Sequence, residues 1–524
     1  MQQGSQPWGR SDLSIGAQLD RRASDGPDFV YGRFEGREFT VGQLADAVNR
    51  LVVALSKLGI GQGDRVSVML ANHVDHIVVF FALLKLGACQ VPINVHLRGE
   101  GLRFLLSHSQ SQMFIVDGRF AEDVDPLLPG LGFRNVIWRD RAGHGVDLAT
   151  LRAHPHADAP PCSVRPDDVV AISYTSGTTG LPKGVMVTDR MLRTCAHAAG
   201  RLTALQAGDV LYVWEPFYHI GGSEVLVLAI QEWTTLAIVE RFSVSKFWSD
   251  VRAFGATHIH FLGGVLALLL KEPPRPDDRH HPVRIAWGGG CPVTVWTAFE
   301  ERFGIGIREC YGMTEASSFT TQNLNNKVGS VGKVLPWFEV AIVDDTGTPL
   351  GAGKRGEIWV RERVPGLIMK GYFHNPEATA AALKDGWLRT GDVGWFDADG
   401  DYYFAGRMKD SIRRRGENIT AFEIERIVND HPDVAESGVI GVANELADED
   451  VKIFLRLKPG ASLDPLDFVR WCEGRMAHFQ VPRYIEFIEA FPKTATERIR
   501  KDRLSRETAG LFDLDKSGYR LKRA

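Results

Sequence analysis

The chain has 524 residues, a formal net charge of -4 and 44% hydrophobic residues. This length is too great for one ordinary domain, and the weak net charge excludes a general electrostatic attraction to nucleic acid or to an anionic membrane. The six cysteines form no CxxC pair and no metal-like spacing, so they suggest neither a disulfide framework nor a zinc site. A reducing cytoplasm is the expected location.

The N-terminal segment, residues 1–28, has no apolar stretch after its charges, so it does not resemble a secretion signal. The most apolar segment, residues 76–93, is interrupted by Lys85 and Gly87. A membrane-spanning helix needs about 20 apolar residues. We therefore predict a buried helix that runs into a strand, and no membrane partner.

In chain order, residues 40–58 have helical apolar spacing and residues 65–70 are β-rich, which starts a βα alternation. The polar, proline-rich segments 154–168 and 272–282 are predicted loops. Residues 334–403 contain short strands and turns such as DDTG and DADG, which predict a smaller β-rich subdomain. The predicted fold class is α/β.

A block of about 100 residues, from Ser411 to about Leu511, resumes the βα pattern and has the usual size of a small domain.

The most informative segment comes earlier, where the string YTSGTTGLPKG (174–184) follows a β-like run. Glycines let backbone N–H groups converge on an anion, hydroxyls add donors, and a lysine adds a point charge. The string is not a Walker loop, because the pattern GxxxxGK[ST] is absent. Its glycines, hydroxyls and lysine nevertheless predict a polyphosphate-binding loop, with the residues Thr175, Ser176, Gly177, Thr178, Thr179, Gly180 and Lys183.

This loop resembles the phosphate loop of the adenylate-forming superfamily, which includes acyl-CoA synthetases, firefly luciferase and the adenylation domains of peptide synthetases. Further motifs of the superfamily follow in order, from about Phe39 to Leu504. The resemblance implies an enzyme that joins a carboxylic acid to coenzyme A through an acyl-AMP. It also implies ATP, Mg²⁺ and coenzyme A as cofactors or substrates, with a large N-terminal domain and a mobile α+β C-terminal domain.

Two motifs resemble the family's acyl and adenine segments. The segment Pro216–His219 resembles the family's P-x-x-H, whose histidine, here His219, lies between the carboxylate pocket and the pantetheine tunnel. The signature Tyr311–Glu315 implies a tyrosine that stacks on adenine, a threonine at the α-phosphate and a glutamate on Mg²⁺, a hard cation that prefers carboxylate oxygen. The residues implied at the nucleotide are Gly289, Gly290, Cys291, Tyr311, Gly312, Met313 and Thr314, and the implied metal ligand is Glu315.

The ribose and hinge motifs lie further along the chain. Asp392 matches the acidic residue that accepts both ribose hydroxyls, and Arg407 matches the basic residue that also reaches the ribose. Lys409 matches the hinge residue about which the small domain rotates between half-reactions. The loop Gly416, Glu417 and Asn418 resembles the one that this rotation brings to the pantetheine chain. The implied parts are residues 1–406, a hinge at 407–411, and residues 412–524.

Two neighbouring positions depart from the family pattern. Relatives carry Pro-Lys-Thr-x-x-Gly-Lys near the C-terminus, and this chain has Glu497 in place of the glycine and Arg498 in place of the catalytic lysine. A planar guanidinium is not equivalent to a compact ammonium. Two interpretations stay open: Arg498 performs the lysine's part in adenylation, or the chain catalyses only thioester formation from an acyl-AMP made by a separate enzyme. Lys493 and Lys501 are nearby in sequence.

The acid is the least specified part of the sequence. Glycines at 221–222, 263–264 and 288 leave room in the implied acyl pocket, which favours a bulky, largely apolar acid. His258 and His260 alternate on a predicted strand and are interpreted as structural. The segments 494–501 and 506–510 resemble the carnitine/crotonobetaine-type CoA ligases more weakly. Two alternative functions stay open: an adenylation enzyme that loads a separate carrier protein, and a non-catalytic binding protein. A homodimer is the candidate assembly.

Overall fold

A computed structural model describes residues 6–9, 11–141, 143–155, 159–175, 182–408, 411–414, 417–444, 449–473, 475–476, 478, 480–494 and 498–521. The chain forms two compact units. The first contains residues 1–290, 297–339 and 360–388, and the second contains residues 291–296, 340–359 and 389–524. The predicted boundaries at 406 and 412 stay predictions.

A seven-stranded sheet forms one layer of the first unit, in the order β7-β6-β5-β3-β4-β8-β9. All of its neighbouring strands are parallel except β8 and β9, which are antiparallel. Its strands are β3 (Arg65–Met69), β4 (Cys89–Pro92), β5 (Met113–Asp117), β6 (Asn135–Arg139), β7 (Val146–Asp147), β8 (Val169–Thr175) and β9 (Lys183–Thr188).

A nine-stranded sheet forms the second layer, in the order β16-β15-β14-β13-β12-β10-β11-β1-β2. Its central strands run parallel from β14 to β1. The strands are β1 (Val30–Phe34), β2 (Arg37–Thr40), β10 (Val210–Val213), β11 (Thr235–Ile238), β12 (His258–Leu262), β13 (Ile285–Gly289), β14 (Gly306–Tyr311), β15 (Thr321–Gln322) and β16 (Lys333–Val334).

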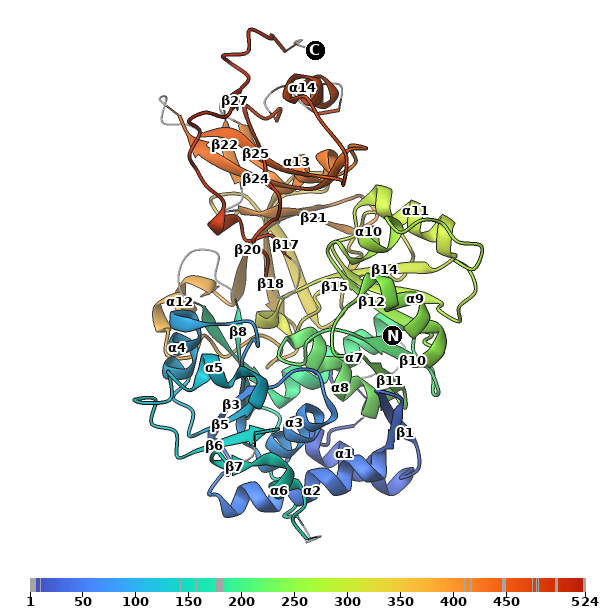
Figure 1. Ribbon diagram of the computed structural model, residues 1–524, viewed down its shortest axis with the longest axis vertical. Coiled ribbons are helices and arrows are strands. Elements are labelled where there is room, and N and C mark those ends of the chain that lie inside the picture. The colour runs from blue at the N-terminus through green and yellow to red at the C-terminus, as the bar shows by residue number, and fades with distance from the viewer. Residues whose placement is uncertain are drawn as a thin grey trace. The chain divides into compact units, whose positions relative to one another are not determined.

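Helices of the first unit bury their apolar sides against these sheets and one another (Figure 1). Helix α2 begins after Thr40, whose hydroxyl accepts from the Gln43 N–H in a capping box. The predicted buried helix and strand at 76–93 are confirmed as α3 and β4. The α-helices here are α1 (Ile15–Asp25), α2 (Val41–Lys57), α3 (Val74–Leu86), α4 (Gly99–His108), α5 (Ala121–Val124), α6 (Leu148–Arg152), α7 (Asp189–Thr203), α8 (Ile220–Glu232), α9 (Val244–Phe254), α10 (Val265–Leu270) and α12 (Pro376–Ala382).

The predicted β-rich subdomain is a five-stranded sheet in the order β17-β18-β20-β19, with β21 paired to β20. Short 3-10 helices, η1 (Gly118–Phe120), η2 (Thr314–Ala316) and η4 (Lys501–Arg503), occur elsewhere in the chain. The strands of this sheet are β17 (Phe338–Val343), β18 (Gly356–Glu362), β19 (Leu383–Lys384), β20 (Trp387–Phe396) and β21 (Tyr402–Arg407), and α11 (Val293–Phe303) precedes them.

The C-terminal part of the second unit has its own core, formed by two helices packed on a four-stranded sheet in the order β24-β25-β26-β27. A separate hairpin joins β22 and β23. The α/β class and the α+β C-terminal part are thereby confirmed. The elements are β22 (Ser411–Arg414), β23 (Glu417–Thr420), α13 (Ala421–Val428), β24 (Val434–Ala443), β25 (Glu449–Leu457), α14 (Pro465–Glu473), β26 (Tyr484–Phe487) and β27 (Phe512–Asp513).

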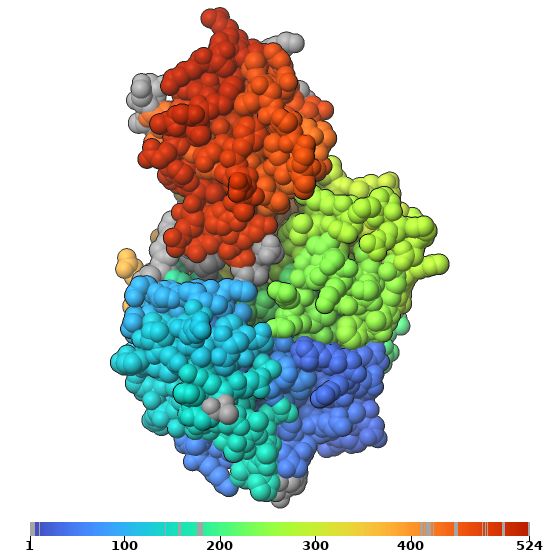
Figure 2. Space-filling view, in the orientation of Figure 1, coloured from blue at the N-terminus to red at the C-terminus, as the bar shows by residue number. Residues whose placement is uncertain are grey.

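No described helix is both long and apolar enough to cross a bilayer. Figure 2 shows the blue and cyan segments, which carry the first helices and strands, packed together on one face of the first unit.

A buried ion pair lies in the first turns of α7, and its carboxylate also holds the start of α1. Arg193 and Asp189 are each 1% exposed and 2.7 Å apart, and the Asp189 carboxylate also accepts from the Ile15 N–H. Removing one partner of such a pair leaves the other charge buried without a counter-charge. Asp189→Ala is therefore expected to lower the free energy of unfolding by about 3–5 kcal/mol in denaturant titrations. The matched change Asp25→Ala breaks the exposed Arg21–Asp25 pair and is expected to have little effect. Equal losses would contradict the assignment.

Candidate active site

The candidate residues of the first unit follow the carboxyl ends of parallel strands. Strands β10, β12, β13 and β14 run in one direction, so their carboxyl ends lie at one edge of the nine-stranded sheet. Ligands of open α/β sheets bind outside this edge. The segments that leave it here are 214–219, 263–264, 289–290 and 311–315.

His219 is the N-cap of α8 and is half-buried. Its Nδ1 accepts from the Gly221 N–H at 3.3 Å, which favours the tautomer with the proton on Nε2. The turn before it is braced by Asn72, whose amide donates to the Glu215 carbonyl and accepts from the Phe217 N–H. The ring is thus held in a fixed orientation at the sheet edge.

The signature segment 311–315 forms a tight turn that ends in η2. Gly312 is required there because a Cβ would lie 2.0 Å from the Ser318 carbonyl oxygen. Tyr311, Thr314 and Glu315 are buried, and Met313 accepts from the N–H groups of the following turn. The turn thus places the candidate adenine, α-phosphate and metal residues, Tyr311, Thr314 and Glu315, in one short segment.

The structure brings Lys183 and Glu315 to one tyrosine. The Tyr372 hydroxyl donates to Glu315 Oε1 at 3.0 Å, and Lys183 Nζ lies 5.1 Å from the centre of the Tyr372 ring. Tyr372 is fixed because Phe373 N–H donates to the Gly184 carbonyl and Met186 N–H donates to that of Gly371. Tyr372 thus contacts both the buried Glu315 carboxylate and the Lys183 side chain.

Sequence reasoning did not find Tyr372. The available signal was a Gly-Tyr pair three residues before the helix start at Asn375 and Pro376, where Asn375 caps α12. Thr175 and Lys183 lie at the facing ends of β8 and β9. The loop residues between them, Ser176, Gly177, Thr178, Thr179 and Gly180, lie outside the described residues.

We predict that Tyr372→Phe weakens the use of Mg²⁺-ATP. Losing a hydrogen bond to a charged carboxylate costs about 1.5–3 kcal/mol, or roughly 10- to 100-fold in the rate of ATP–pyrophosphate exchange. A Mg²⁺ titration of that rate measures the effect. Tyr519→Phe removes a comparable hydrogen bond to Glu473, 2.8 Å long, and is expected to leave exchange unchanged. A Tyr372→Phe enzyme with normal exchange would refute a supporting role.

In the second unit, Asp392 and Arg407 face each other across the β20–β21 pair. Arg407 Nε lies 3.1 Å from Asp392 Oδ1, and Asp392 is only 2% exposed. The Thr390 hydroxyl accepts from the Asp392 N–H and donates to the Ile358 carbonyl, which fixes the turn. The predicted ribose pair is therefore brought together.

Arg498 belongs to the same unit and lies within electrostatic reach of this pair. Desolvation, followed by the charge of Arg407, lowers the pKa of Arg498, and the Asp392 carboxylate opposes this shift. Arg498 is an exposed residue. Its backbone closes a turn with Thr494, which donates to the Arg498 carbonyl at 2.7 Å.

The two neighbouring lysines are engaged elsewhere. Lys493 Nζ lies 2.8 Å from Glu436, and Lys501 Nζ lies 2.8 Å from Glu425. Neither glutamate belongs to the candidate site. Arg498, by contrast, interacts electrostatically with both residues of the ribose pair.

The hinge and pantetheine motifs are only partly described. Lys409 and Gly416 lie outside the described residues, and Glu417 and Asn418 are described as backbone of β23, opposite Arg414 and Arg413. Arg414 is buried, and its guanidinium donates to Asp450 and to the Val481 carbonyl. Arg414 is therefore bound inside the C-terminal core.

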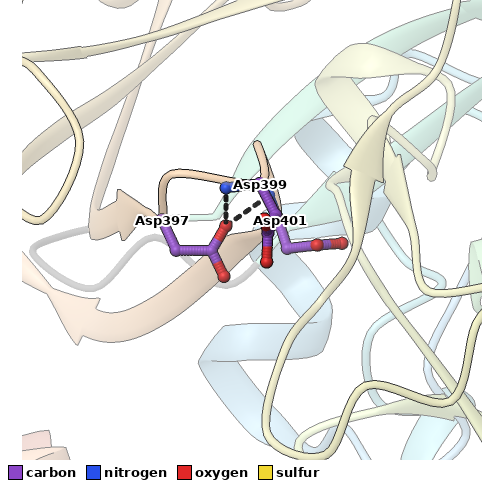
Figure 3. Close-up of side chains that lie close together, drawn as sticks. All are labelled: Asp397, Asp399 and Asp401. Carbon is purple, nitrogen blue, oxygen red and sulfur yellow. Dashed lines mark hydrogen bonds between the residues drawn. The ribbon is translucent and has the colours of Figure 1, made fainter.

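Three aspartates in the β20–β21 turn, Asp397, Asp399 and Asp401, gather their carboxylates within 4.8 Å of one another (Figure 3). The Asp397 carboxylate accepts from the backbone N–H groups of the other two and from the Tyr403 hydroxyl. These bonds are those of a turn that closes on its own aspartate. The cluster is therefore explained by the local fold.

The glycines of the implied acyl pocket differ from one another. An added Cβ would lie 2.1 Å from the Pro216 carbonyl oxygen at Gly222 and 1.8 Å from that of Phe261 at Gly288, so these glycines allow close backbone approach. Of these glycines, only Gly263 and Gly264 face open space.

The residues implied at the adenine are held by backbone hydrogen bonds. The Gly289 carbonyl accepts from the Gly263 N–H, and the Gly290 N–H donates to the Glu309 carboxylate. Cys291, which belongs to the second unit, is buried.

Comparison with known proteins gives a consistent result. The AMP-binding enzyme family model matches residues 19–373, and that of the AMP-binding enzyme C-terminal domain matches residues 423–498. A crotonobetaine/carnitine–CoA ligase of Salmonella paratyphi A is 34% identical over 94% of this chain and 99% of its own length.

Solved structures agree. The anthranilate CoA ligase AuaEII in complex with anthranoyl-AMP has a TM-score of 0.85 at 25% identity, covering 93% of this chain and 96% of its own. The o-succinylbenzoate CoA synthetase of Bacillus subtilis with its acyl-adenylate has a TM-score of 0.83 at 26% identity, covering 94% and 98%. The chain therefore belongs to the AMP-binding enzymes of the adenylate-forming superfamily and is an acid–thiol ligase of the acyl-CoA synthetase type.

Proposed function

We propose that this chain catalyses both half-reactions of acyl-CoA synthesis, with Arg498 taking the part of the family's lysine in adenylation. The observation that supports this most directly is the position of Arg498 within the electrostatic field of Asp392 and Arg407, while Lys493 and Lys501 are held by glutamates. A permanently charged guanidinium there attracts the negative charge that develops as carboxylate oxygen attacks the α-phosphorus.

The other residues have separate tasks in this proposal. Tyr311 lies against the adenine, Asp392 accepts the ribose hydroxyls, and the loop that ends at Lys183 binds the phosphates. His219 borders the path between acid and thiol. Its fixed ring lets the same residue serve the two steps without rearrangement of α8.

The residues also fit a magnesium ion. Glu315 supplies a buried carboxylate whose orientation is fixed by the Tyr372 hydroxyl, beside a lysine suited to phosphate. Hard cations of this kind prefer carboxylate oxygen and are held jointly with substrate phosphates. The ion would neutralise triphosphate charge at this point, and Tyr372 would keep the carboxylate directed toward it.

The second candidate is an enzyme that performs only thioester formation from a supplied acyl-AMP. The guanidinium at 498, in place of an ammonium, is the observation that favours it. A separate carrier protein as acceptor, and a bulky apolar acid as substrate, remain predictions of the sequence.

Carboxylate-dependent ATP–pyrophosphate exchange separates the two candidates. A panel of acids of graded size and charge, including crotonobetaine and carnitine, after which the curated relatives are named, is supplied with ATP and Mg²⁺. Exchange together with CoA-thioester formation supports the complete ligase. Thioester formation only from supplied acyl-AMP supports the half-enzyme, and neither activity with any acid would overturn both.

A further inference from the structure

A cluster of aromatic rings and histidines surrounds the two ends of the phosphate loop, 174–184. Tyr174, near the end of β8, opens the loop, and Gly184, near the start of β9, closes it. The two residues are partners in the β8–β9 pair. A Cβ at Gly184 would lie 2.6 Å from the Ile172 side chain and 3.3 Å from the Tyr174 ring, so the glycine leaves room for that ring. The Tyr174 ring therefore lies against the point where the loop ends.

A histidine on a distant helix holds this ring. His108 is the last residue of α4, and its Nδ1 lies 2.7 Å from the Tyr174 hydroxyl. Burial, followed by the charge of His374, lowers the pKa of His108, and burial raises the pKa of the Tyr174 hydroxyl. Near neutral pH the imidazole is therefore uncharged and the hydroxyl keeps its proton, so the hydroxyl can donate to Nδ1. One short hydrogen bond thus ties α4 to the start of the loop.

The same imidazole packs against the segment that holds the other end of the loop. The Phe373 N–H donates to the Gly184 carbonyl at 2.7 Å, and the His108 and Phe373 ring centres are 5.8 Å apart, edge to face. His374 stacks on Phe373 at 4.0 Å and has a φ of 49°, which residues other than glycine rarely adopt. Such a conformation persists only where the surrounding structure imposes it. His108 thus links Tyr174 at one end of the loop to Phe373 at the other.

We propose that His108 is a positioning residue that keeps the two ends of the phosphate loop aligned for the triphosphate of ATP. This role rests on the proposed function, in which the loop that ends at Lys183 binds the phosphates. His108 acts through Tyr174 and Phe373 and touches neither the nucleotide nor the acid. Because ATP and AMP differ only in the two terminal phosphates, a misaligned loop is expected to weaken the binding of ATP more than that of AMP.

A double-mutant cycle tests the hydrogen bond. His108→Phe keeps an aromatic ring without the acceptor, and Tyr174→Phe keeps the ring without the hydroxyl. Affinities for Mg²⁺-ATP and for AMP are measured by calorimetry, without acid or CoA. Each single variant is expected to bind ATP about three- to tenfold more weakly, as the loss of one hydrogen bond predicts, with AMP affinity nearly unchanged. The double variant is expected to bind ATP no more weakly than either single variant.

Kinetics give a second measurement of the same effect. In carboxylate-dependent ATP–pyrophosphate exchange, the KM for ATP of each single variant is expected to rise about three- to tenfold, while kcat changes little. A loss of fold would instead lower kcat through the fraction of active protein. The thermal midpoint of each variant shows that it is folded.

Two further variants separate the hydrogen bond from packing. His108→Asn loses the ring but carries a polar atom as many bonds from Cβ as Nδ1, and is expected to keep ATP affinity within about twofold of the wild type. Tyr31→Phe removes a different buried hydroxyl of the first unit, which donates to the Leu226 carbonyl at 2.8 Å. It is expected to lower the thermal midpoint and to leave the affinities for both nucleotides unchanged.

The outcomes separate this role from the proposed function. Unchanged ATP affinity in His108→Phe, equal weakening of ATP and AMP, additive losses in the double variant, or a His108→Asn variant as weak as His108→Phe would each overturn the positioning role and leave the ligase function standing. A selective loss of ATP affinity in a protein whose wild type forms no thioester supports the positioning role and counts against the ligase function.

Discussion

Arg498→Ala is expected to slow carboxylate-dependent ATP–pyrophosphate exchange by about a hundred- to a thousandfold, because it removes a positioned cation from the charge that develops on the phosphate. Thioester formation from supplied acyl-AMP is expected to stay near the wild-type rate, since the role proposed for Arg498 is confined to adenylation. A loss of exchange without a loss of thioester formation is the result that the proposed role predicts.

Two companion variants sharpen this result. Arg498→Lys restores the family's residue and is expected to equal or exceed the wild-type exchange rate. Arg500→Ala removes a neighbouring guanidinium that pairs with Asp502 and is expected to leave exchange unchanged. If Arg498→Ala exchanges normally, or if wild-type protein shows no exchange while it consumes acyl-AMP, the half-enzyme interpretation replaces ours.

Asp392→Ala is expected to impair both half-reactions, because ATP and acyl-AMP carry the same ribose. A hydrogen bond to a charged carboxylate contributes about 1.5–3 kcal/mol, so losing two would lower kcat/KM by about a hundredfold or more. Binding of AMP, measured by calorimetry, is expected to weaken in parallel, since this contact does not depend on the acid.

The control lies in the same sheet. Asp399 is exposed in the β20–β21 turn, and Asp399→Ala is expected to leave AMP affinity and both rates intact. Asp392→Ala also leaves Arg407 without its ion-pair partner, so the thermal midpoint is measured alongside. Loss of exchange with undiminished AMP affinity would show that Asp392 acts elsewhere than at the ribose.

Sequence reasoning identified those candidate residues whose motifs are local. The signature 311–315, the Asp392 turn and the departure at Arg498 are short strings whose residue types carry their chemistry. It did not find Tyr372, because a lone Gly-Tyr pair has no chemical signature of its own. It also attributed room to five glycines, whereas at Gly222 and Gly288 the space is already filled by backbone from distant positions.

The amino-acid sequence by itself determined the α/β class, the β-rich insertion and the adenylate-forming motifs, because hydrophobic periodicity and short motifs are encoded by neighbouring residues. Only the tertiary structure decided which groups interact across the chain: the Tyr372 hydroxyl with Glu315, the charge of Arg498 with that of Asp392, and Lys493 and Lys501 with their glutamates. It also decided that Glu215 and Glu224 are buried, because burial depends on what packs around a side chain. Pairings of this kind are set by packing between segments that are far apart in the chain.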